Sequence, residues 1–141
     1  SDTHPAWLKN DGSASPGFTT QTLQMRYVSS SNLLPKEFEL ADLNGDGHMD
    51  MLGTFANYNE PEHRYEYPLV WYENDGQLSP NFSERLINLR YGNDGEEFDA
   101  IATADLDGDG DLDVVAATKE KLIWFPAYTP RNAARRWALC E

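Results

Sequence analysis

Short apolar segments separated by turn-forming residues recur along the whole chain. Phe38 and Leu40 alternate with polar neighbours, and Ile101 and Thr103 repeat the pattern, which is typical of half-buried β-strands. Each pair leads into an acidic segment, after which apolar residues resume. Together the apolar segments predict short strands over residues 18–27, 38–40, 49–52, 69–72, 82–89, 101–103, 112–115 and 123–125.

These strands belong to a repeat with a period of 63 to 64 residues. An internal repeat of this kind is a sign of a protein built from stacked units. The recurring landmarks are WLKNDG at 7–12 and WYENDG at 71–76, Phe18 and Phe82, and the acidic residues Asp42 and Asp105. In both WxxNDG segments the Asn-Asp-Gly triplet predicts a turn, since Gly and Asn tolerate positive φ. Trp124 marks a third, degenerate copy, and the recurrence predicts that Trp7, Trp71 and Trp124 pack between sheets.

Four short strands in one period predict an antiparallel blade of the kind found in β-propellers. The predicted fold class is all-β, with four-stranded β-propeller-type blades in about two and a half repeats. The predicted units are residues 1–34, a partial blade with the third and fourth strands, 35–97, a complete blade, and 98–141, a blade whose last strand is degenerate. In that last blade residues 133–136 are not strand-like, so the fourth strand is either shifted to 137–139 or irregular.

The complete blade carries an insertion between its second and third strands. Asp50 and Trp71 are 21 residues apart, whereas Asp113 and Trp124 are 11 apart. The inserted segment, about residues 57–67, predicts an embellished hairpin loop where a ligand could bind, because loops often carry binding residues. The alternative is a loop that packs on a neighbouring sheet. The candidate binding residues are Tyr58, His63, Arg64, Tyr65 and Tyr67.

Two acidic loops with the spacing Asp-x-Asp/Asn-x-Asp-Gly-x-x-Asp lie between the first and second predicted strands of their blades. Positions one, three, five and nine offer side-chain oxygens, and position seven would offer its backbone carbonyl. Glycine at position six permits the sharp turn that brings these oxygens around one centre. The predicted metal ligands are Asp42, Asn44, Asp46, His48 and Asp50 in the first loop, and Asp105, Asp107, Asp109, Asp111 and Asp113 in the second.

Calcium is the metal that this ligand set favours, and two calcium sites are predicted. Calcium takes about six to eight oxygen ligands in a tolerant geometry, whereas magnesium demands a stricter octahedron and zinc prefers His and Cys. An EF-hand would need a glutamate at position twelve between two helices, but position twelve is Gly53 or Ala116 and the flanks are β-like. The simpler alternative is a pair of acidic turns that hold no metal.

Charge and composition narrow the range of partners. The net charge of −13, from 24 acidic and 11 basic residues, argues against nucleic acid, whose phosphates need a basic surface. No apolar run approaches the roughly 20 residues of a membrane-spanning helix, so no membrane insertion is expected, and no signal peptide is visible. Cys140 is the single cysteine and cannot form an internal disulfide.

The acidic loops and the WxxNDG segments resemble the FG-GAP or VCBS repeat family, whose repeats are the blades of integrin-like β-propellers. The resemblance covers about residues 7–125 and rests on ADLNGDGHMD at 41–50, ADLDGDGDLD at 104–113 and the two WxxNDG segments. It implies a calcium loop between the first two strands of a blade. It also implies a secreted or cell-surface protein that recognises proteins or glycans. The insertion, the degenerate last strand and the number of blades depart from the family pattern.

The number of blades bears on function, because propellers close with about four to eight. About two and a half units cannot close a ring, so we expect either part of a longer propeller or head-to-tail self-association into a ring or filament. The expected function is a calcium-stabilised extracellular module with a structural or assembly role. The alternative is a lectin-like or protein-recognition domain. No Gly-x-Ser-x-Gly, His-Glu-x-x-His or phosphate-loop motif is present, so no enzymatic activity is expected.

Overall fold

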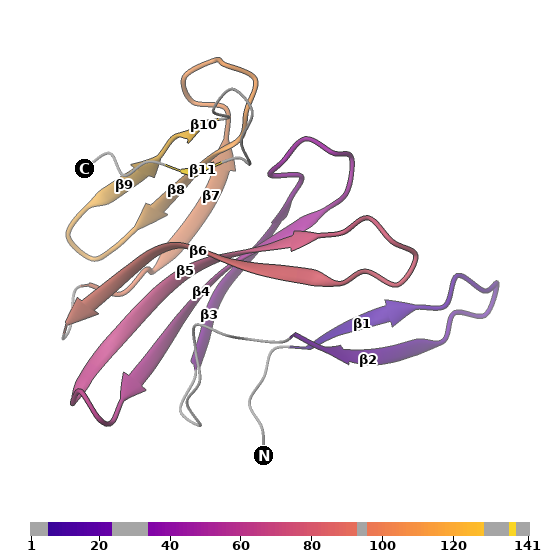
Figure 1. Ribbon diagram of the computed structural model, residues 1–141, viewed down its shortest axis with the longest axis horizontal. Helices are drawn as coiled ribbons and strands as arrows, with labels where there is room; N and C mark the ends of the chain where they lie inside the picture. Colours follow the sequence, from indigo (N-terminus) through magenta and orange to yellow (C-terminus); the bar gives the residue numbers. More distant parts are fainter. Residues whose placement is uncertain (1–5, 24–33, 93–95, 129–135, 138–141) are drawn as a thin grey trace.

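Three antiparallel sheets follow one another in the computed structural model, which describes residues 6–23, 34–92, 96–128 and 136–137 (Figure 1). The first sheet pairs β1 (Ala6–Asn10) with β2 (Phe18–Thr22). The central sheet has the order β3 (Leu34–Ala41), β4 (Asp50–Asn59), β5 (Arg64–Asn74) and β6 (Phe82–Gly92). The third has the order β7 (Ala100–Ala104), β8 (Asp113–Ala117) and β9 (Leu122–Phe125). A short fourth pair joins β10 (Ala127–Tyr128) to β11 (Arg136–Trp137).

The prediction of an all-β fold made of antiparallel blades is confirmed. The central sheet holds four strands in sequence order, and its first acidic loop lies between β3 and β4. The third sheet repeats this arrangement with the second acidic loop between β7 and β8. Residues 24–27, 133–135, 138–139 and Cys140 of the sequence predictions lie outside the described residues.

The Asn-Asp-Gly triplets of the two WxxNDG segments form the predicted turns. Gly12 and Gly76 have φ of 73° and 69°, a conformation that L-residues with a Cβ rarely adopt. In each turn the aspartate N–H closes the loop on a backbone carbonyl further along, Asp11 to Gly17 at 3.0 Å and Asp75 to Asn81 at 3.1 Å. The repeat therefore extends from sequence to local backbone geometry.

The insertion differs from its prediction, because it is mostly strand and not loop. Residues 57–67 lengthen β4 and β5, and the ladder continues through the pairs Asn57–Glu66, Tyr58–Tyr65 and Asn59–Arg64. The connecting turn is limited to residues 60–63, where His63 adopts a φ of 49°. Alternating tyrosines favour a strand over a loop, since aromatic residues suit a half-buried pleated surface.

Most of the core lies between the central and third sheets. The buried cluster there joins Leu52, Leu69 and Trp71 of the central sheet to Val114 and Phe125 of the third. A smaller cluster covers the opposite face of the central sheet, and its members are Phe55, Val70 and Tyr72, with Met51, Phe82 and Leu86 packed against them. The first sheet contacts this second face through Trp7, whose ring lies 5.9 Å from Phe82 in an edge-to-face arrangement.

Hydrogen bonds of side chains and an ion pair also connect the sheets. Glu39 of β3 accepts the N–H of Thr103 at 3.1 Å and its hydroxyl at 2.7 Å through the same carboxylate oxygen. Lys36 forms an ion pair with Glu97, just before β7. Lys9 of the first sheet donates to Ser79 at 2.5 Å. The three sheets are thus linked by apolar packing and by a few polar contacts, with no shared strand among the described residues.

Candidate metal centre

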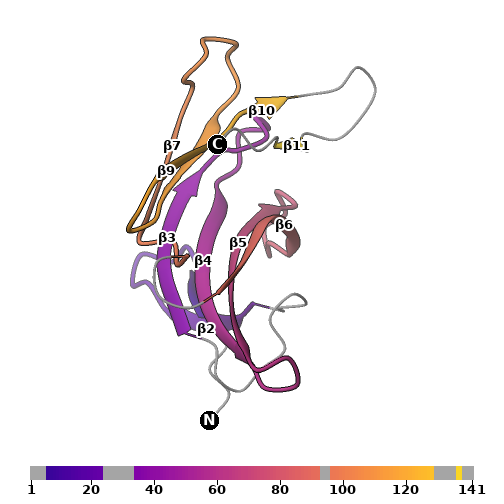
Figure 2. The ribbon, with the colours of Figure 1, turned by 90° about the vertical axis from the view of Figure 1, so that its left-hand side faces the viewer.

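The two acidic loops lie at the same end of their sheets (Figure 2). Each leaves the first strand of its sheet and returns as the second, so two hydrogen-bonded strands hold its ends together. The register fixes this junction through the pairs Ala41–Asp50 and Ala104–Asp113. Positions one and nine of each loop are therefore brought side by side by the ladder itself.

Three side-chain to backbone hydrogen bonds recur in both loops. The position-one carboxylate accepts the N–H of the position-six glycine, at 2.8 Å in the first loop and 3.0 Å in the second. The position-three oxygen accepts the N–H of position five at 3.1 Å in both loops. The position-five carboxylate accepts the N–H of position seven at 2.8 Å in both. These bonds turn the carboxylates inward, toward the concave side of the loop.

Glycines at two positions make this curvature accessible. Gly47 and Gly110 at position six have φ of 87° and 92°, as the sequence predicted. Gly45 and Gly108 at position four, which the sequence analysis did not single out, have φ of 71° and 79°. Two residues in the left-handed backbone conformation, separated by one other residue, allow the nine-residue loop to curve tightly. The recurrence of both glycines in the two loops was the signal that could have indicated this.

The second loop brings three carboxylates together. Ligand atoms of Asp105, Asp107 and Asp109 all lie within 4.8 Å of one another, and all three residues are exposed. Among the described residues, this is the one group of three His, Cys, Asp or Glu side chains that could share a cation. At the same three positions the first loop has two carboxylates, Asp42 and Asp46, with the amide of Asn44 between them in sequence. The donors are all hard oxygens, which fits calcium.

The electrostatics of the two loops differ accordingly. Desolvation raises the pKa of Asp107, and the negative charges of Asp109, Asp113 and Asp105 raise it further. In the first loop the His48 N–H lowers the pKa of Asp46, and the Asn44 amide adds to that effect. The second loop therefore concentrates negative charge that a bound cation would neutralise.

The position-nine carboxylates are buried and accept hydrogen bonds from backbone N–H groups. Asp50 accepts the Leu43 N–H at 3.2 Å on one oxygen and the Asn74 N–H at 2.8 Å on the other. Asp113 does the same with the N–H groups of Leu106 at 3.1 Å and Ala127 at 2.8 Å. Asp50 thereby ties the start of its loop to the last residue of β5, and Asp113 ties the start of its loop to the first residue of β10. Spacing alone indicated a ligand at this position and gave no sign of this second role.

Position nine is still compatible with metal binding. A carboxylate offers about four lone-pair sites, so two N–H bonds leave capacity for a cation. Burial raises the pKa of Asp50, while the N–H groups of Asn74 and Leu43 and the Trp71 side chain act in the opposite direction. Asp111 and Asp113 lie outside the group of three carboxylates, and their role as ligands stays a prediction.

His48 occupies position seven, where its carbonyl is the predicted ligand. Its imidazole extends toward the turn after β5: a Cβ built on Gly76 would lie 2.5 Å from two atoms of the ring. Asn74 in the same turn donates its side-chain amide to the Met49 carbonyl at 3.0 Å. The first acidic loop and the Asn-Asp-Gly turn are therefore packed together as one unit.

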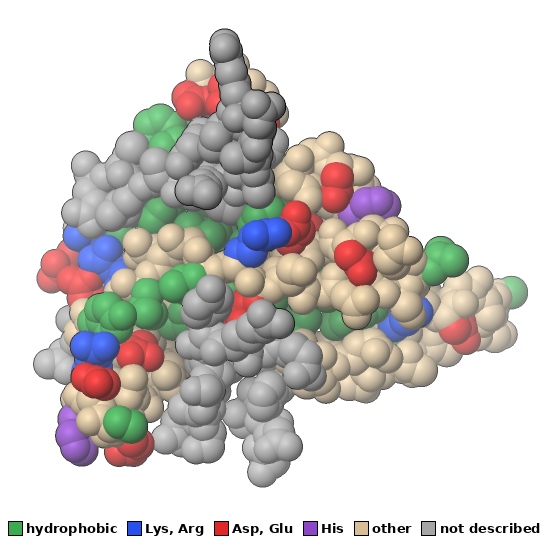
Figure 3. Space-filling model, viewed as in Figure 1, with side chains coloured by type: hydrophobic (Ala, Val, Ile, Leu, Met, Phe, Trp, Pro, Cys, Tyr) green, Lys and Arg blue, Asp and Glu red, His purple; other side chains and the backbone are tan. Residues whose placement is uncertain are grey.

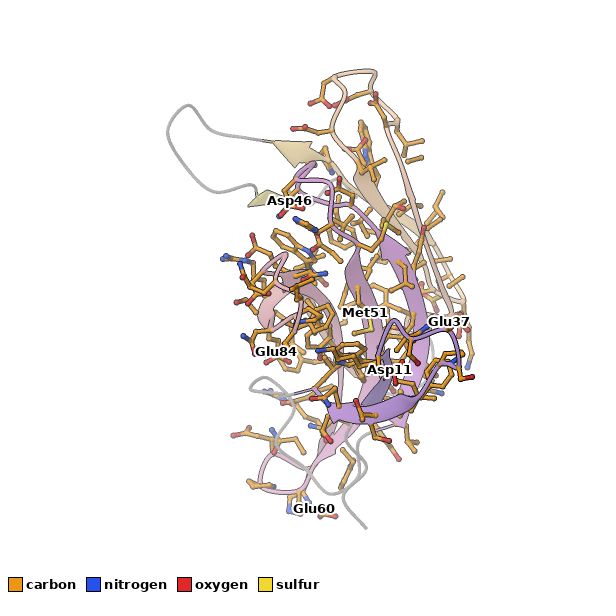
Figure 4. The ribbon with its side chains drawn as sticks, turned by 90° about the vertical axis from the view of Figure 1, so that its right-hand side faces the viewer. Asp11, Glu37, Asp46, Met51, Glu60 and Glu84 are labelled. Atoms are coloured by element: carbon orange, nitrogen blue, oxygen red, sulfur yellow. The ribbon has the colours of Figure 1, made fainter. Side chains whose placement is uncertain are left out.

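The insertion lies at the opposite end of the central sheet. Figure 4 shows Asp46 of the first acidic loop and Glu60 of the insertion turn at the two ends. Tyr58 and Tyr65 pair across the strands with ring centroids 5.0 Å apart, and Tyr65 is 44% exposed. Tyr67 is 5% exposed and belongs to the main core, so it packs inside the protein and is not accessible to a ligand.

The other face of the insertion is polar. The Arg64 guanidinium lies 4.0 Å from the centroid of the exposed Tyr91 ring. Glu66 accepts hydrogen bonds from Asn59 at 2.8 Å and Asn57 at 3.4 Å. His63 is exposed in the turn. Of the five predicted binding residues, four thus reach the surface, and Tyr91 joins them from β6, which sequence spacing could not indicate.

Fold and loops together define the class of the protein. A four-stranded antiparallel sheet with an acidic loop between its first two strands, repeated in the next sheet, is a β-propeller-type repeat module. The model of the FG-GAP-like repeat matches residues 42–116, more than half of the chain. The chain therefore belongs to the FG-GAP-like repeat family. No curated protein and no solved structure matches it. Within the described residues no helix is long and apolar enough to cross a membrane.

Proposed function

We propose that this chain is a calcium-stabilised, extracellular β-propeller-type repeat module with a structural or assembly role. The observation that carries the proposal is the convergence of Asp105, Asp107 and Asp109 within 4.8 Å on a hydrogen-bonded scaffold that both loops share. Calcium in the second loop would offset repulsion among these carboxylates. The same scaffold in the first loop supports a second site at Asp42, Asn44, Asp46, the His48 carbonyl and Asp50.

The way the loops are built supports the structural role. Protein oxygens supply most of the ligands that calcium takes, which leaves little room for a sugar or another ligand on the metal. Each loop connects two paired strands, so a cation there stabilises the hairpin. Extracellular calcium is abundant enough to fill loops of this kind, and that supports secretion or display at the cell surface.

Thermal unfolding with and without calcium tests the proposal. Two sites, each stabilised by about 2.7 kcal/mol when calcium is ~100 times its Kd, should raise the Tm by roughly 10–20 °C over excess chelator. Asp109→Ala should lose about half of this shift. Glu120→Ala removes an exposed carboxylate from the β8–β9 turn of the same sheet and serves as the matched control. An identical Tm in calcium and chelator would refute the metal sites.

Surface charge argues against nucleic acid as a partner. On the face shown in Figure 3, the described Lys and Arg side chains are scattered singly among acidic ones. The net charge of −13 points the same way. Nucleic acid is therefore not proposed as a partner. The carboxylates of the acidic loops are proposed as calcium ligands, and no enzymatic activity is proposed.

Recognition of a glycan or protein is the second candidate function, and the insertion favours it. Tyr65 offers an exposed ring beside Tyr58, and Arg64 lies over Tyr91 on the other face. Exposed aromatic and arginine side chains are enriched at recognition sites. A glycan array should give a hit that Tyr65→Ala removes and Leu78→Ala, at an exposed position of the β5–β6 turn, leaves intact. An array without hits would eliminate the glycan form of this function.

A further inference from the structure

The outward side of the third sheet carries an apolar surface that no described element covers. In the ladder, Val115 is paired with Ala102 and Trp124, and Ala117 with Ala100 and Leu122, so these side chains share one side of the sheet. The opposite side, with Val114, Ala116, Ile123 and Phe125, is the one buried against the central sheet. Leu122 is 70% exposed. We call this surface the Trp124 face; its residues are Ala100, Ala102, Val115, Ala117, Leu122 and Trp124.

The first sheet has a matching surface on its own outward side. Trp7 and Lys9 are directed toward the central sheet, as their contacts with Phe82 and Ser79 show. The residues between them in the pleat are therefore on the far side. Leu8 and Phe18 lie there, 63% and 59% exposed. We call this surface the Leu8 face; its residues are Ala6, Leu8, Phe18, Thr20 and Thr22, all exposed and all uncharged.

The internal repeat indicates what could cover the Trp124 face, because the central sheet has an equivalent surface. Trp71 of the central sheet occupies the same repeat position as Trp124, with Leu52 and Leu69 at the positions of Val115 and Leu122. In the central sheet these three residues are between 0% and 2% exposed, buried by the next sheet. The corresponding apolar surface is thus buried in the central sheet, whereas in the described part of the third sheet Leu122 is exposed and Val115 and Trp124 are half-buried.

The repeat also indicates what packs on the Leu8 face, because the central sheet has an equivalent side. Leu8 and Phe18 occupy the repeat positions of Tyr72 and Phe82 in the central sheet. That side of the central sheet is where the first sheet packs, and Trp7 contacts Phe82 there. Trp7 of the first sheet therefore lies against Phe82, the aromatic residue of the fourth strand in the central sheet. On the Leu8 face, the corresponding aromatic, Phe18, has no such tryptophan among the described residues.

We infer that the Trp124 face of one chain packs on the Leu8 face of a second copy. This extends the proposed assembly role, on which it rests, by naming the two surfaces and the pairing of Trp124 with Phe18. Such a contact is head-to-tail, so it produces a ring if the rotation closes and a filament if it does not. Both faces are uncharged, but two chains of net charge −13 repel, so calcium and physiological salt favour the contact.

Sedimentation equilibrium in calcium and 0.15 M salt tests the inference with charged substitutions on each face. The wild-type chain should associate beyond a dimer as its concentration rises. Leu122→Glu and Leu8→Glu should each weaken association by more than about tenfold, because a buried unpaired charge is costly. Leu78→Glu alters a leucine that is 98% exposed and lies on neither face, and it should behave as wild type.

Mixing the two variants gives the sharpest outcome. The Leu122→Glu chain keeps its Leu8 face, and the Leu8→Glu chain keeps its Trp124 face, so an equimolar mixture should form a dimer and stop there. Dimers in the mixture but not in either variant alone establish the head-to-tail pairing. A mixture that stays monomeric, or single variants that associate as wild type does, would overturn it.

Failure of the inference can be separated from failure of the proposed function. The calcium-dependent Tm shift is measured on the same samples, and all three leucine variants should keep it because none touches an acidic loop. A wild-type chain that keeps the shift but stays monomeric at high concentration overturns the inference alone and assigns the Trp124 face to an occupant other than a second copy. A chain without the shift overturns the metal proposal whatever its association state.

Discussion

Asp107 and Asn44 occupy the same position of the two acidic loops but differ in charge. Because desolvation and neighbouring carboxylates raise the pKa of Asp107, its ionisation is less favourable in the folded, calcium-free chain than in the unfolded chain. The stability this group contributes is present below its unfolded pKa near 3.8 and is lost as pH rises through the raised folded pKa. At neutral pH the calcium-free fold therefore carries an electrostatic penalty at this residue.

Exchanging the two residues should have opposite effects at pH 7. Asp107→Asn should raise the Tm in chelator and reduce the shift that calcium causes, since Asn keeps the oxygen that accepts the Asp109 N–H. Asn44→Asp should lower the Tm in chelator, because it replaces an amide that donates to Asp46 and Glu73. The two Tm values, measured with and without calcium, check this. If both substitutions moved the chelator Tm in the same direction, repulsion within the loop would not be the cause.

Because Gly76 has no Cβ, the Asn-Asp-Gly turn after β5 can pack against the first acidic loop. Its φ of 69° resembles that of Gly12 at 73°, but a Cβ would lie 2.5 Å from His48 at Gly76 and has no neighbour within 4 Å at Gly12. We expect Gly12→Ala to cost about 1 kcal/mol of unfolding free energy and Gly76→Ala slightly more, because the exposed His48 ring must also move aside. Urea denaturation measures both. The excess at Gly76 should disappear in a His48→Ala background, and its persistence there would exclude the imidazole as the cause.

At the scale of elements, Glu39 links strands of two sheets. Its carboxylate oxygen accepts two hydrogen bonds from Thr103 at a partly buried position between β3 and β7. Glu39→Ala should destabilise the protein by about 1–3 kcal/mol, because hydrogen bonds to a charged group are strong and the Thr103 N–H would lose its partner. Thr103→Val removes only the hydroxyl and should cost less.

A double-mutant cycle separates this contact from general packing. The two substitutions together should cost less than the sum of the single ones, by at least about 0.5 kcal/mol in urea denaturation. Glu37→Ala, an exposed position of the same strand, provides the control and should change stability by no more than about 0.5 kcal/mol. Strict additivity of Glu39→Ala and Thr103→Val would show that the contact does not couple the sheets.

The elements differ in how far sequence could predict them. Apolar alternation and Asn-Asp-Gly turns indicated the strands, because both signals act within a few residues. The tyrosines of the insertion were assigned to a loop, although they continue the strand alternation of β4 and β5. The buried position of Tyr67 depends on the third sheet packing over it, and the Glu39–Thr103 contact joins residues 64 apart. Contacts between sheets depend on how sheets are oriented, which local patterns do not encode.

For the acidic loops, too, the sequence predicted contacts within the motif but not contacts with the rest of the sheet. Their spacing indicated which oxygens could converge, and the group of Asp105, Asp107 and Asp109 agrees with that geometry. The spacing did not show that Asp113 also accepts the Ala127 N–H, because that bond reaches across to the chain after β9. Side chains within a loop are thus predictable from the motif, whereas their links to the rest of the blade require the fold.

For the whole molecule, the arrangement of the sheets determines how calcium should stabilise it. Each loop joins the first two strands of a different sheet, and the sheets are connected to one another by side chains and not by a continuous ladder. The first sheet contains no acidic loop and contacts the central one through Trp7 and Lys9. Calcium bound at one loop should therefore stabilise its own sheet most.

Amide hydrogen exchange followed by NMR measures the stabilisation by calcium for each sheet separately. With calcium at ~100 times its Kd, amides of β3–β4 and β7–β8 should exchange up to about a hundredfold more slowly than in chelator, with a much smaller change in β1–β2. Asp109→Ala should abolish the slowing in β7–β8 and leave that in β3–β4, because the first loop keeps its ligands. Equal loss of protection in both sheets would instead mean that they open as a single unit, with the contacts around Trp71 and Glu39 strong enough to transmit calcium binding across the whole stack.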